Sequence, residues 1–161
     1  MQEQPTREQI DQWHRWFAIR CNNDSWDLAS KPDRTPVEDR DMLYLAYASA
    51  FHWSKIGKPI NNARAEIALA HMHALLGDAE LSLKYAQHCL DFFENNDCED
   101  WDLAFAHAEI AQAAALLGDV SLHTKHYKEA QRRGNAIQGE EDRRIFLEEF
   151  ARIPAQVRSI R

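Results

Sequence analysis

The chain has 161 residues and a net charge of −7 at neutral pH, with an isoelectric point near 5.6, so its electrostatic field opposes binding to nucleic acid or to acidic membrane surfaces. No window approaches the ~18 apolar residues of a membrane span, and the polar first residues do not resemble an export signal. Three cysteines without C-x-x-C spacing favour a reducing compartment, so we expect a single-domain cytoplasmic protein.

Segments rich in Ala, Leu, Glu, Lys and Arg alternate with a few glycines and prolines, which predicts an all-α fold. Thr6 with Gln9, and Thr35 with Glu38, fit the capping boxes that begin the first two helices. Asn22-Asn23 is a candidate break within the first of them. In chain order the predicted helices cover about 6–28, 36–56, 59–76, 79–94, 102–117, 120–137 and 140–153.

An internal repeat connects these helices. The sequence Ala-Leu-Leu-Gly-Asp occurs at 74–78 and again, unchanged, at 115–119, which is 41 positions later. Five residues before each copy, a large apolar residue precedes an alanine, as Leu69-Ala70 and Ile110-Ala111. This pattern resembles the tetratricopeptide repeat, in which small residues let two antiparallel helices approach closely. The family's usual spacing is about 34 residues, and the acidic loop around Asp97 accounts for the extra length.

The whole chain also looks like an uncharacterised family of small bacterial tetratricopeptide-like proteins. The segments that carry this second resemblance are Phe51-His52-Trp53-Ser54, Asn61-x-x-Arg64-Ala65, Asp102-Leu103-Ala104-Phe105-Ala106 and Glu140-Glu141-Asp142-Arg143. The two resemblances imply one superhelix of about three antiparallel helix pairs and a C-terminal capping helix. Its parts are a degenerate N-terminal pair at 6–57, repeat units at about 59–94 and 100–137, and the capping helix at 140–153.

A superhelix of this kind implies a concave face, lined by the first helix of each pair, that binds a protein or peptide partner without catalysis. On that face we expect Arg64, His71, Phe105 and Gln112. The identity of the partner cannot be read from the sequence. The family's clamp for a C-terminal carboxylate needs several Lys, Arg and Asn residues here, and apolar or acidic residues occupy the matching places instead. The resemblance therefore disfavours the capture of chaperone tails.

A further candidate binding residue is Trp53, at the end of the second predicted helix. The short connection 57–59 brings His52-Trp53 toward Arg64 and Glu66, and this set could hold a small acidic or peptide ligand. Alternatively, Trp53 anchors a helix corner, and Glu66 neutralises Arg64 in a rim ion pair. Both interpretations stay open at the level of sequence.

Eight histidines suggest a second class of function, a small-molecule-binding protein or an enzyme that uses His52, His71 and His107 between helices. His123 and His126 could share a helix face, but no nearby carboxylate or thiolate completes a metal site. The sequence contains no recognisable nucleophile or phosphate-binding motif. We therefore expect neither catalytic residues nor a metal or cofactor.

The last predicted helix has more large apolar residues than one covering face needs. These residues are Ile145, Phe146, Leu147, Phe150 and Ile153. A stacked repeat leaves its final pair uncovered, so we expect this helix to cap the preceding pair. The excess could join two copies of the chain in a homodimer.

Overall fold

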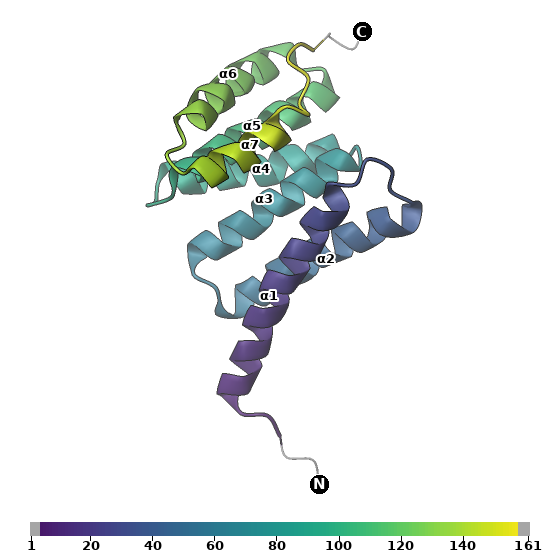
Figure 1. The fold of residues 1–161 in the computed structure, drawn as a ribbon, viewed down its shortest axis with the longest axis vertical. Coiled ribbons are helices and arrows are strands. Elements are labelled where there is room, and N and C mark those ends of the chain that lie inside the picture. Colours follow the sequence, from purple (N-terminus) through teal and green to yellow (C-terminus); the bar gives the residue numbers. More distant parts are fainter. Residues whose placement is uncertain (1–3, 158–161) are drawn as a thin grey trace.

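The computed structural model describes residues 4–157, which form seven helices and no strand (Figure 1). The predicted all-α fold is confirmed, and each helix lies within a few residues of its expected range. The candidate break at 22–23 is wrong, because the first helix is continuous. The helices are α1 Arg7–Ala29, α2 Pro36–Ile56, α3 Pro59–Leu75, α4 Ala79–Glu94, α5 Asp100–Leu117, α6 Val120–Ala136 and α7 Glu140–Phe150.

The first two helices begin at the capping boxes that the sequence predicts. The N–H of Gln9 donates to Thr6 Oγ1 over 3.2 Å, while the Gln9 side chain accepts from the Thr6 N–H over 2.8 Å. Thr35 and Glu38 exchange the same pair of bonds at the start of α2. Each box satisfies N–H groups that a helix leaves unpaired at its start, a contribution of about 1 kcal/mol.

The two copies of Ala-Leu-Leu-Gly-Asp form the same turn. Gly77 and Gly118 have φ angles of 81° and 70°, a left-handed conformation that a β-carbon would strain. The next residue, Asp78 or Asp119, donates its N–H to a carbonyl five positions back, over 2.9 and 3.0 Å respectively. Each aspartate side chain then caps the following helix. The sequence repeat is therefore also a repeat of local structure.

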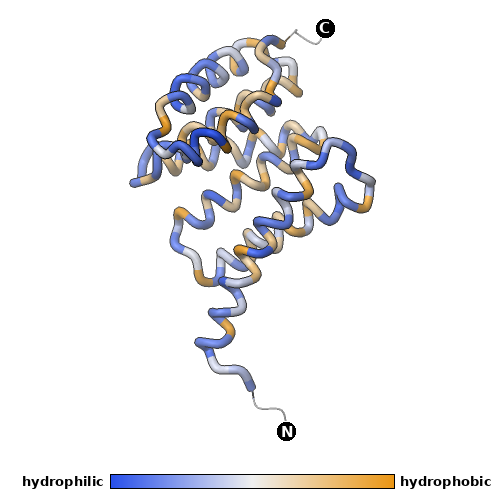
Figure 2. Tube along the Cα trace, in the orientation of Figure 1, coloured by the Kyte–Doolittle hydropathy of each residue, from blue (hydrophilic) through white to orange (hydrophobic). Residues whose placement is uncertain are grey.

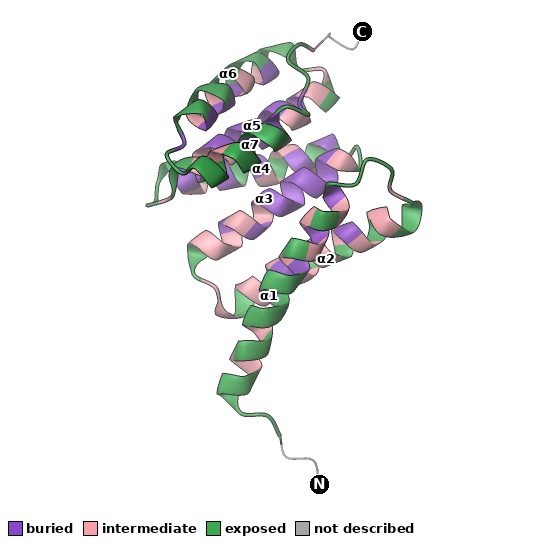
Figure 3. Ribbon diagram, viewed as in Figure 1, coloured by how far each residue is buried: buried purple, intermediate pink, exposed green. Residues whose placement is uncertain are grey.

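Helices adjacent in sequence pack as antiparallel pairs, α1 with α2, α3 with α4 and α5 with α6. About half of the buried residues lie on α3 and α5 (Figure 3). Ala70 and Ala111 have no exposed surface, in agreement with a close approach of the paired helices. Figure 2 shows polar and apolar residues interleaved along the helices, and none of the helices within 4–157 could cross a membrane.

Helix α7 packs on α5 and α6 through two aromatic side chains. Phe146 is fully buried and meets Phe105 edge to face, with 5.1 Å between ring centroids, while Phe150 lies against Tyr127. Gly134 makes room for this contact, because a β-carbon there would lie only 1.9 Å from the Phe146 ring. The homodimer contact through this helix stays a prediction.

Candidate functional site

A pocket of about 500 Å³ lies where α1, α3, α5 and α7 meet. The last two turns of α1 form one side of it, and α3, α5 and α7 contribute two or three side chains each. Several of the residues at its edge are exposed, among them Asn23, Asp27 and Ile145. The pocket is therefore open to solvent, and its volume is in the range that ligand sites usually have.

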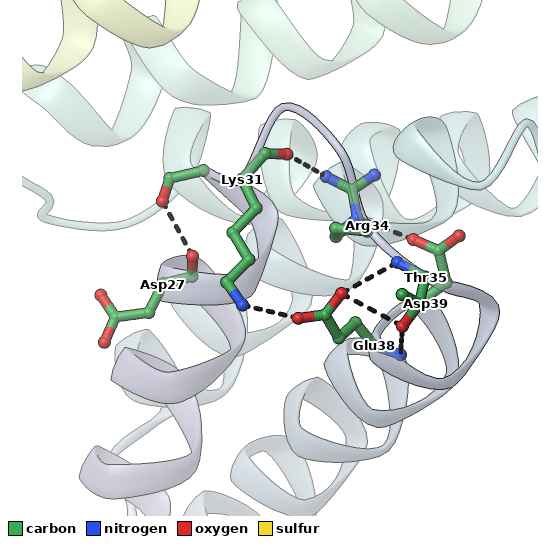
Figure 4. A network of polar contacts seen from close by, with 7 residues as sticks. Asp27, Lys31, Arg34, Thr35, Glu38 and Asp39 are labelled. Atoms are coloured by element: carbon green, nitrogen blue, oxygen red, sulfur yellow. Dashed lines mark hydrogen bonds and ion pairs between the residues drawn. The ribbon is translucent and has the colours of Figure 1, made fainter.

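A polar network fixes the end of α1 that borders the pocket (Figure 4). Lys31 Nζ lies 2.6 Å from Glu38 Oε1, and Arg34 donates to Asp39 over 2.7 Å across the corner between α1 and α2. The hydrogen bond from Lys31, followed by that from the Thr35 N–H, lowers the pKa of Glu38 to about 2. These contacts hold the last turn of α1 in place relative to α2.

Arg64, on α3, reaches across to α5. Its Nε and Nη2 atoms both donate to the carboxylate of Asp102, each over 2.8 Å, and its guanidinium lies 4.3 Å from the ring centroid of Trp101. The hydrogen bond to Asp102 is the main cause of a raised Arg64 pKa. Asp102 is buried, with 1% of its side chain exposed. Arg64 therefore serves first to neutralise a buried charge.

The alternative ion pair of Arg64 with Glu66 is wrong. Glu66 instead contacts the ring of His88, on α4. Glu66 is the carboxylate closest to Arg64 along the sequence, and both lie on α3. However, Glu66 faces α4, whereas Arg64 faces α5.

His71 lies behind the pocket wall, and 5% of its side chain is exposed. Its Nδ1 is 2.9 Å from Glu109 Oε1 on α5, and its Nε2 is 3.8 Å from Glu149 Oε2 on α7. Trp26 of α1 lies against its ring, with centroids 4.6 Å apart. Burial alone would lower the His71 pKa, but the nearby charges of Glu109 and Glu149 outweigh burial and raise it. His71 thus connects four helices.

The five residues predicted to bind a partner do not all come together. Arg64 and Phe105 line the pocket, and His71 lies directly behind it. Gln112 is partly buried about two turns further along α5 and lies outside the pocket. Trp53 is also outside, and its ring packs against Gly57 at the corner between α2 and α3. The structure agrees with the corner-anchor interpretation of Trp53.

His52 and His107 each pair with another histidine and not with His71. Nδ1 of His52 is 2.8 Å from Nδ1 of His14 between α1 and α2, and Nδ1 of His107 is 2.9 Å from that of His126 between α5 and α6. Burial and the neighbouring ring lower the His107 pKa to about 4. Each of these pairs thus joins two neighbouring helices. His52, His71 and His107 do not line one pocket.

The contribution of α1 was missed by sequence reasoning. Asn22, Asn23, Trp26 and Asp27 all line the pocket, yet the first helix pair has no readable repeat signature. A usable signal is that these polar and aromatic residues form one face of α1 beside its small buried residues, which continue to the end of the helix. Among the described residues, no three His, Cys, Asp or Glu side chains are grouped closely enough to hold a metal ion.

Exposed aromatic residues also gather away from the pocket. Trp13, Trp16 and Phe17 are each between 44% and 60% exposed on the N-terminal part of α1, which extends beyond the other helices in Figure 1. Phe51 of α2 is similarly exposed and lies edge to face with His52. These residues provide natural controls for experiments on the pocket.

Comparison of the chain with models of protein families, with curated proteins and with solved structures gave no match. The tetratricopeptide resemblance therefore rests on the repeated sequence and on the two equivalent turns.

Proposed function

We propose that the chain is a tetratricopeptide-like superhelix of three antiparallel pairs closed by α7, and that it binds a peptide segment of a partner protein without catalysis. The first helices of the three pairs, α1, α3 and α5, line one pocket together with α7. In a stack of helix pairs these helices form the concave face. The shared pocket is the observation that carries the proposal.

The side chains of the pocket suit an extended peptide. Trp26, Ile67 and Phe105 offer apolar and aromatic surface for an anchoring side chain. Asn22 and Asn23 place amide groups, which can donate to and accept from a peptide backbone, on the α1 side. A few polar groups among mostly apolar walls are typical of ligand sites.

A small-molecule site remains the second candidate, and His71 is the observation that favours it. Its Nε2 atom has no hydrogen-bond partner among the described residues, and Glu109 orients the opposite side of the ring. Such a pair can serve as a general base. However, this ring packs against Trp26 and does not line the pocket, so we prefer the peptide.

Replacing Asn23 by Trp should block the site without disturbing the core, because Asn23 is exposed at the pocket edge. Peptides selected from a displayed random library against the wild-type protein should bind N23W at least about tenfold more weakly. Binding is measured by fluorescence anisotropy, and equal melting temperatures verify the fold.

The matched control is Gln12→Trp, which adds the same side chain to an exposed position of α1 outside the pocket. This variant should bind the selected peptides as the wild type does. Peptides that bind N23W unchanged, or a library that yields no binder, would contradict the proposed function.

A further inference from the structure

The pocket contains more negative than positive charge. Its lining residues include three carboxylates, those of Asp27, Asp102 and Glu149, but one cationic side chain, that of Arg64. Asp102 and Arg64 neutralise each other through two hydrogen bonds. Among the lining residues, the charge that a ligand meets therefore comes mainly from Asp27 and from Glu149, which also has an ion pair with Arg152 outside the lining.

Neither of these two carboxylates is fully engaged within the chain. In Figure 4 the Asp27 carboxylate makes no contact with the other residues drawn. Glu149 Oε2 has an ion pair with Arg152 Nη1 at 3.2 Å and lies 3.8 Å from His71 Nε2, but it accepts no well-aligned hydrogen bond among the described residues. The Glu149 carboxylate can therefore accept a further donor from a ligand.

The aromatic walls also favour a positive charge. Trp26 and Trp101 both line the pocket, and the face of an indole ring attracts cations more strongly than that of other aromatic side chains. The chain itself contains an example, because the Arg64 guanidinium lies over Trp101 while it binds Asp102. A second cation that contacts Trp26 and Glu149 would repeat this arrangement.

The same contacts disfavour an acidic ligand. Arg64 already directs Nε and Nη2 at Asp102, and His71 directs Nδ1 at Glu109. A carboxylate or phosphate in the pocket would therefore be repelled by Asp27 and Glu149. Among the lining residues it would find no cation that is free of a carboxylate partner.

We propose that the pocket recognises a basic side chain, the guanidinium of arginine or the ammonium of lysine, on the bound peptide. The cation lies against the indoles and takes Glu149 and Asp27 as its counter-charges. The inference rests on the proposed function for the source of this side chain, but the preference for a cation can be measured without any partner.

The test compares Nα-acetyl-arginine amide with Nα-acetyl-citrulline amide, which has nearly the same shape and no charge. Ligand-observed NMR gives the dissociation constant of each for the whole chain. We expect the arginine probe to bind about tenfold more tightly, since a desolvated cation–π contact and a carboxylate together reach that size. Equal binding of the two probes would overturn the proposal.

Two variants and one control locate the effect. Glu149→Gln should remove most of the preference for arginine, whereas Glu148→Gln, an equal charge change on the exposed side of α7, should keep it. Because Glu149 also lies near His71, Asp27→Asn provides a second test at an exposed position, and it should weaken arginine binding severalfold. A preference that survives both E149Q and D27N would contradict the inference.

The outcomes separate this inference from the proposed function. Library peptides that enter the pocket without enrichment in Arg or Lys would contradict the cation preference and support the peptide site. Arginine amide that binds through Glu149, with no peptide selected, would support the cation preference and contradict the peptide site.

Discussion

Replacing Arg64 by Met is expected to lower the free energy of unfolding by about 3 to 5 kcal/mol, the largest effect of any single change near the pocket. Asp102 has 1% of its side chain exposed and would be left as a buried carboxyl group without its guanidinium partner. Chemical denaturation of the two proteins at neutral pH measures the difference.

The double variant R64M/D102L controls for the removal of a buried ion pair as a whole. It should recover most of the lost stability, since apolar pairs of similar volume often replace such ion pairs without cost. A deficit of about 1 kcal/mol should remain, because Asp102 also accepts the N–H of Glu99 at the start of α5. A single variant as stable as the wild type would contradict the assignment of Arg64 to structure.

Replacing His71 by Phe is expected to lower the free energy of unfolding by about 3 kcal/mol near pH 6, which is the second large effect. The phenyl ring can occupy the space against Trp26, but Glu109, which is 2% exposed, loses its partner. The double variant H71F/E109M should be closer to the wild type than H71F. Urea denaturation at several pH values provides the measurement.

The difference in stability between the wild type and H71F should change with pH in one direction. The His71 pKa is raised in the folded state, so its charged form stabilises the fold fully below the ordinary histidine pKa of about 6.5. That contribution is lost as the pH rises through the folded-state value. His107 and His126, whose pKa values are lowered, titrate in both proteins and cancel in the comparison. A wild-type advantage that grows with rising pH would contradict this account of His71.

The helices were predictable because their signals are local. Thr6 with Gln9 and Thr35 with Glu38 are three residues apart, and Gly77-Asp78 contains both the end of one helix and the cap of the next. Such signals depend on nearest neighbours along the chain. The same reasoning placed the ends of the last helices within a few residues.

The partners of Arg64 and His71 were not predictable in this way, because they depend on the register between helices. Asp102 and Glu109 each lie 38 positions after their partners, whereas the sequence repeats every 41. The two pairs have the same offset, and their members lie two helical turns apart on both α3 and α5. Basic and acidic residues matched in this way are a signal that the sequence contains. The internal repeat identifies equivalent positions of two helices, not positions that are neighbours in space.

The most direct test of the pocket as the binding site uses the five tryptophans of the chain. A peptide selected from the library is added to ¹⁵N-labelled protein, and the indole N–H signals are followed by NMR. The account predicts changes at Trp26 and Trp101, which line the pocket, and little change at Trp13, Trp16 and Trp53, which lie outside it. Changes confined to Trp13 and Trp16 would place binding on the exposed end of α1 and contradict the account.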